Sequence, residues 1–91
     1  MRFKIEVTKQ YLKDLKLARK RGLNERKLND VIRILSEGGT LPAKNKDHAL
    51  VGNFAGIREC HITPDWLLLY SKNTEFCVLS LVRNGTHSDL F

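Results

Sequence analysis

Three histidines and one aspartate are the side chains of this sequence best suited to proton transfer. His48, His61 and His87 all lie in the second half of the chain, and Asp65 follows His61 by four residues. Histidine gains or loses a proton near neutral pH, and a carboxylate accepts a proton or holds an imidazole in one tautomer. His61 and Asp65 flank a predicted tight turn, and the last predicted strand returns toward the same end of the sheet. The sequence therefore predicts acid-base chemistry at one sheet end.

Other kinds of site find less support. Three histidines and a carboxylate could bind zinc with an open position, but the residues are widely spaced and form no H-E-x-x-H or H-x-H pair. We therefore expect no metal and no other cofactor. No G-x-S-x-G nucleophile and no phosphate-binding glycine loop is present. Cys60 and Cys77 lie in apolar, strand-like runs, so we expect both to be reduced core residues.

The charge balance indicates a polyanionic partner. Lysine and arginine outnumber aspartate and glutamate by 16 to 10, which gives a formal charge of +6. Such a surface favours nucleic acid or an acidic protein. Lys44 and Lys46 lie beside His48 and could bind a phosphate there. Trp66 and Phe91 are candidates either for the core or for stacking on a base.

The pattern of apolar residues predicts one α+β domain over residues 1–91. Residues 2–8 alternate as a strand does, and two helices follow, capped by Thr8 and Asn24 and ended by glycines. After a long loop over residues 40–56, three strands are expected near 57–62, 66–71 and 75–83, joined by short turns. The order β-α-α-β-β-β predicts an antiparallel four-stranded sheet with a helical hairpin on one face. We expect no membrane segment and a cytoplasmic protein, because no apolar run approaches 18 residues and no signal peptide is evident.

Two longer runs, "DHALVGNFAGIRECHITPDWLLLY" and "RNGTHSDLF", resemble the YafQ branch of the RelE/ParE toxin superfamily. That branch shows D-H-x-L-x-G-x-x-x-G-x-R, then H-I-x-P-D-W-L-L-x-Y, then R-T-G-T-H-x-x-L-F. The resemblance implies a RelE-like fold and a bacterial toxin that cleaves mRNA on the ribosome and is inhibited by a cognate antitoxin. By motif position it implies catalytic roles for His48, His61, Asp65 and His87. The RNA-binding residues expected from the resemblance and the charges together are Lys44, Lys46, Arg58, Trp66, Arg83 and Phe91.

The implied reaction is metal-free cleavage through the ribose 2'-OH. It needs a base for the 2'-OH, an acid for the leaving 5'-oxygen and positive charge at the phosphate. We expect His87 to be the acid and Asp65 or His48 the base. Asn84 replaces the usual threonine of the last motif, and we expect it to tune the loop or the substrate preference.

Two alternatives stay open at the level of sequence. The first is a non-catalytic toxin like those of the ParE branch, which acts on a protein target and needs no proton-transfer residues. The second is a plain RNA-binding module, which is supported by charge alone. For a toxin, the basic surface is expected to bind a cognate antitoxin that is acidic and partly disordered.

Overall fold

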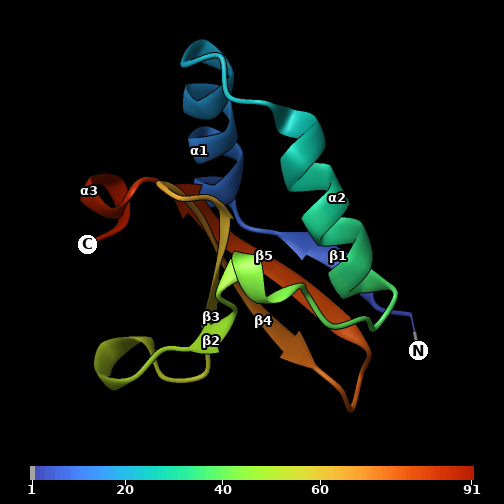
Figure 1. Cartoon of the computed structure of the whole chain (residues 1–91). Coiled ribbons are helices and arrows are strands. Elements are labelled where there is room, and N and C mark those ends of the chain that lie inside the picture. Colours follow the sequence, from blue (N-terminus) through green and yellow to red (C-terminus); the bar gives the residue numbers. More distant parts are fainter. Residues whose placement is uncertain (1) are drawn as a thin grey trace.

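The computed structural model describes residues 2–91, which form a mixed sheet with two helices on one face (Figure 1). The strands are β1 (Lys4–Val7), β2 (His48–Ala49), β3 (Arg58–Thr63), β4 (Trp66–Asn73) and β5 (Val78–Gly85). The helices are α1 (Lys9–Lys20), α2 (Glu25–Ser36) and the short α3 (His87–Leu90), with 3₁₀ turns η1 (Ala43–Asn45) and η2 (Gly52–Phe54). Within the described residues, no helix is both long and apolar enough to cross a membrane.

The helical hairpin begins at the two predicted caps. The Thr8 hydroxyl accepts a hydrogen bond from the Tyr11 amide at the start of α1. The same hydroxyl donates to the carbonyl of Val82, so one side chain both caps the helix and fastens it to β5. Asn24 caps α2 by accepting from the amide of Arg26. Capping satisfies amides that the first turn of a helix leaves free, which explains why both helix starts were predicted from sequence.

The sheet differs from the prediction in strand number and direction. Its order is β1-β5-β4-β3-β2, and β1 pairs with β5 in parallel, from Lys4 opposite Val78 to Val7 opposite Leu81. The sheet is therefore five-stranded and mixed, and the predicted four-stranded antiparallel sheet is wrong on these two points. The three antiparallel strands were predictable because short turns join them. No short turn joins β1 to β5, and the two-residue β2 lies within the predicted loop.

The two faces of the sheet bury different sets of residues. The larger core packs under α1 and α2 and includes Tyr11, Leu28, Leu35, Trp66, Leu68, Tyr70, Leu79 and Leu81. A smaller cluster on the opposite face contains Leu67, Leu69 and Leu90, packed with Leu50, Ile57 and Val82. The second face is therefore partly covered by α3 and by the loop before β3. It is this face that carries the histidines.

The core departs from the sequence pattern in two places: Cys77, which was expected in the core, and β1, whose alternation is typical of a half-buried strand. Cys60 is buried, but Cys77 lies in the turn before β5 at a positive φ of 54° and is partly exposed. The apolar side chains of β1 are also exposed, with 44% of Ile5 and 46% of Val7 accessible to solvent. β1 is an edge strand, so packing covers it less than the alternating pattern suggested.

Candidate active site

A row of three titratable side chains crosses β2 and β3 on the sheet face opposite the helical hairpin. His48 lies directly opposite Glu59 in the strand pairing, and Glu59 and His61 share a face because they are two residues apart in β3. The Glu59 Oε1 atom is 3.4 Å from Nε2 of His48 and 3.6 Å from Nε2 of His61. Only 5% of Glu59 is exposed, so a buried carboxylate sits between two imidazoles.

The segment after β5 brings the third histidine to this row. The ring centroids of His61 and His87 are 5.8 Å apart, and Nδ1 of His87 is 3.4 Å from Oδ1 of Asp65. Asp65 itself lies in the turn between β3 and β4, as predicted. The structure thus brings together His48, His61, Asp65 and His87, which the sequence proposed as catalytic residues.

The position of His87 is fixed by a capping box at the start of α3. Thr86 accepts from the amide of Asp89, and the Asp89 carboxylate accepts from the amide of Thr86. The same carboxylate receives two hydrogen bonds from Arg21, at 2.6 and 3.2 Å, which tie the tail to the end of α1. The Arg21 guanidinium and the Thr86 amide hold the pKa of Asp89 well below its usual range. A charged Asp89 therefore supports the conformation that presents His87.

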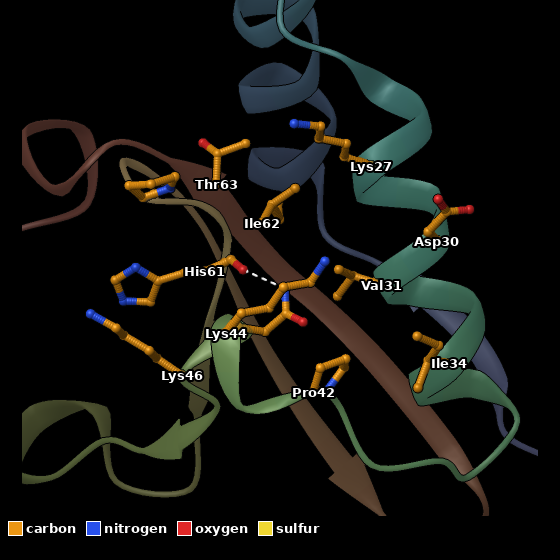
Figure 2. Close-up of a pocket in the computed structure, with 12 residues that line it drawn as sticks. Lys27, Asp30, Val31, Ile34, Pro42, Lys44, Lys46, His61, Ile62 and Thr63 are labelled. Carbon is orange, nitrogen blue, oxygen red and sulfur yellow. Dashed lines mark hydrogen bonds between the residues drawn. The ribbon is translucent and has the colours of Figure 1, made fainter.

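Lys44 and Lys46 border a pocket that extends around the edge of β3 to His61. The pocket has a volume of about 690 Å³ and lies between α2, η1 and the end of β3 (Figure 2). Lys27 of α2 adds a third lysine to its rim, while Val31, Ile34, Pro42 and Ile62 supply apolar walls. His61 also lines the pocket, and its carbonyl accepts a hydrogen bond from the buried side chain of Asn45 at 2.7 Å. Positive charge is thus available beside the candidate proton-transfer groups.

The two arginines proposed for RNA binding already have carboxylate partners. Arg58 lies on the helix-facing side of β3 and is 3.3 Å from Asp47, whose carboxylate also accepts from the Tyr70 hydroxyl. Arg83 donates two hydrogen bonds to Asp14 of α1, at 3.0 and 3.1 Å. These pairs fix the start of β2 and the end of β5. Both arginines therefore hold strands of the site in position, with their guanidinium groups bonded to carboxylates.

Two further residues have different roles from those expected. Trp66 is 2% exposed and its indole N–H donates to Asn84, so the ring has no surface for a base and belongs to the core. Asn84 is also buried; its amide group donates to the carbonyl of Tyr11 and its backbone N–H donates to Asp14. It therefore supports packing between β5 and α1 and cannot contact a substrate. Phe91, the other aromatic residue predicted to stack on a base, is 57% exposed and lies beside His87.

Sequence reasoning missed Glu59 and Lys27. The signal for Glu59 was present, because residues two apart in a strand share a face and Glu59 precedes the singled-out His61 by two positions. Lys27 had no such signal. It comes from α2, and only the packing of that helix against β3 places it at the pocket.

Glu59, His61 and His87 could also hold a metal ion. One ligand atom from each lies within 4.8 Å of the others. Two imidazoles and one carboxylate match the ligand types of known zinc sites, so these residues fit a divalent ion better than their sequence spacing suggested.

Comparison with known proteins places the chain in a family. Residues 3–91 match the family model described as the bacterial toxin of the type II toxin-antitoxin system, YafQ. The mRNA interferase toxin YafQ of Escherichia coli strain K12 is 42% identical over 88 residues, which cover 96% of this chain and 94% of that protein. The crystal structure of the E. coli DinJ-YafQ toxin-antitoxin complex superposes with a TM-score of 0.91 at 40% identity, covering 100% of this chain and 99% of the other. A metal-bound toxin from Helicobacter pylori gives 0.91 at 42% identity over the whole of both chains. The sequence motifs, the fold and these matches agree, and the chain belongs to the YafQ family of type II toxins.

Proposed function

We propose that this protein is an mRNA endoribonuclease, the toxin of a bacterial type II toxin-antitoxin system, and that it cuts mRNA on the ribosome in the cytoplasm. The observation that carries the proposal is the convergence of His48, His61 and His87 with two carboxylates on one sheet face. Its relatives named mRNA interferase toxin YafQ support the same activity.

His87 is the general acid in the proposed reaction. It is 56% exposed at its side chain, so it can reach a substrate, and Asp65 beside Nδ1 can orient the ring. With Nδ1–H donated to the carboxylate, the protonated ring carries its second proton on Nε2 and gives that proton to the leaving 5'-oxygen, which leaves a neutral imidazole. Asp65 then serves as the residue that positions the acid, which favours His48 over Asp65 as the base.

His48 is the general base for the ribose 2'-OH. Its Nδ1 lies 2.7 Å from the carbonyl oxygen of Lys46. A carbonyl only accepts, so Nδ1 carries the proton in the neutral ring and Nε2 has the free lone pair. Glu59, 3.4 Å from that Nε2, would stabilise the imidazolium formed when His48 takes the proton.

The phosphate is bound by the lysines at the edge of β3. Lys44 and Lys46 supply positive charge beside His61, and Lys27 adds a third positive charge in the pocket of Figure 2. Charge placed where the phosphate becomes more negative lowers the barrier to cleavage. Attack by the 2'-oxygen leaves a 2',3'-cyclic phosphate and a 5'-hydroxyl.

A metal ion at Glu59, His61 and His87 would act as a Lewis acid on the phosphate. It would also occupy a nitrogen of His87, which the proposed reaction needs for proton donation. Metal-free cleavage therefore predicts that EDTA treatment of the purified toxin preserves its activity, and that added Zn²⁺ inhibits it.

The partner in the cell is an acidic antitoxin. A net charge of +6 over a small protein favours a polyanionic segment that orders as it binds. The related E. coli toxin forms a complex with DinJ.

The test is a primer-extension assay of mRNA in a translating extract with wild-type toxin and His87→Ala. A positioned proton donor contributes about 10²- to 10⁴-fold, so the variant should lose cleavage by that factor while its circular dichroism is unchanged. A 2'-deoxy nucleotide at the cut site should abolish cleavage by the wild type. Growth arrest without any mRNA cuts would instead support the non-catalytic toxin that acts on a protein target.

A further inference from the structure

Two exposed phenylalanines meet beside His87. Phe54 and Phe91 are 38% and 57% exposed, and their ring centroids are 5.3 Å apart at an interplanar angle of 72°. The Phe91 ring is also 6.5 Å from that of His87. Large exposed apolar rings that gather at one place are more informative than rings scattered singly. In an edge-to-face pair the edge of one ring covers one face of the other, and the exposed fractions of both rings leave further aromatic surface for a ligand.

The smaller core cluster includes residues from both segments that carry the two phenylalanines. Phe54 ends the 3₁₀ turn in the loop between β2 and β3, which is closed by hydrogen bonds from Leu50 N to Ile57 O and from Ile57 N to Phe54 O. Leu50 and Ile57 pack against the cluster that contains Leu90, the residue before Phe91. Figure 1 shows this loop and α3 on the same side of the molecule, away from α2. The loop and the tail are therefore positioned together.

We propose that Phe54 and Phe91 form a stacking platform for one base of the mRNA, next to the phosphate that His87 acts on. The inference rests on the proposed function and extends it to a contact with one base of the substrate. Phe54 was not among the residues predicted to bind RNA, because it occupies a variable position of the D-H-x-L-x-G-x-x-x-G-x-R motif. Aromatic faces bind unstacked bases without regard to sequence, and the nearby lysines favour the RNA backbone. The nearness of the pair to His87 favours an RNA base over a protein side chain as the occupant.

The chain offers matched variants for a test. Phe54→Ala removes half of the platform, and Phe54→Trp keeps an aromatic face. Phe76→Ala is the control, because Phe76 is another exposed phenylalanine, 71% accessible, in the turn between β4 and β5. Stacking on one base corresponds to about a 5- to 150-fold change in binding. We expect Phe54→Ala to lower kcat/KM for mRNA by a factor in this range, mainly through KM. Phe54→Trp should lose less than Phe54→Ala because it keeps an aromatic face, and Phe76→Ala should match the wild type.

A modified substrate separates stacking from a structural effect. Programmed ribosomes carry mRNA with an abasic ribonucleotide on the 5' or, separately, the 3' side of the cut. One of these substrates should reduce wild-type cleavage to the level of Phe54→Ala, and Phe54→Ala should lose nothing further on it. If Phe54→Ala shows the same loss relative to the wild type on the intact and the abasic substrates, the proposal is overturned. Unchanged cleavage of the intact substrate by Phe54→Ala would overturn it as well. If the wild type cuts no substrate, the proposed function itself fails, and this outcome is distinct from both.

Discussion

Replacing Asp14 by alanine should destabilise the protein far more than an ordinary surface substitution. The Asp14 side chain is 8% exposed. It accepts two hydrogen bonds from Arg83, at 3.0 and 3.1 Å, and one from the backbone N–H of Asn84 at 3.2 Å. Breaking a fully buried ion pair by removing one partner costs about 3 to 5 kcal/mol. Since 30% of the Arg83 side chain reaches solvent, we reduce the expected cost to about 2 to 4 kcal/mol.

The measurement is urea and thermal unfolding followed by circular dichroism. For a domain of this size, the expected loss corresponds to a fall in Tm of about 10 to 25 °C. Asp30→Ala is the matched control, because Asp30 also pairs with an arginine, Arg33, at 3.5 Å, but both side chains are more than half exposed. That change should cost less than about 0.5 kcal/mol. If Asp14→Ala and Asp30→Ala unfold at the same urea concentration, the hydrogen bonds of Asp14 do not hold β5 to α1.

Glu59→Gln keeps the shape of the side chain but removes its negative charge beside His48 and His61. The variant should stay folded and cleave mRNA about 10- to 100-fold more slowly. An activity equal to that of the wild type would exclude Glu59 from the site. Arg21 and Thr86 lower the pKa of Asp89 in the folded state, so this carboxylate stabilises the fold above the unfolded pKa of about 4 and less as pH falls below it. In unfolding titrations, the stability gap between wild type and Asp89→Asn should therefore shrink below about pH 4, and a constant gap would contradict this assignment. Burial raises the pKa of Cys60 to about 12, so iodoacetamide at pH 8 should label Cys77 in the native protein and Cys60 only after denaturation, which mass spectrometry of the peptides would show.

The sequence alone determined the local structure and the chemical character of the site. Thr8 and Asn24 marked the helix starts because capping is a short-range interaction, and Pro64 with Asp65 marked the turn between β3 and β4. The residue types also indicated acid-base chemistry, because few side chains exchange protons near neutral pH.

Tertiary structure decided the partners of those residues. Parallel pairing of β1 with β5 joins segments more than 70 residues apart, and no local pattern encodes it. The same holds for Asp14 with Arg83 and for Arg21 with Asp89, which lie 69 and 68 positions apart in the chain. Burial, too, was a property of the fold: it placed Trp66 and Asn84 inside and left Phe54 and Phe91 outside. Periodicity reports which face of a strand or helix a side chain occupies, but only packing determines what covers that face.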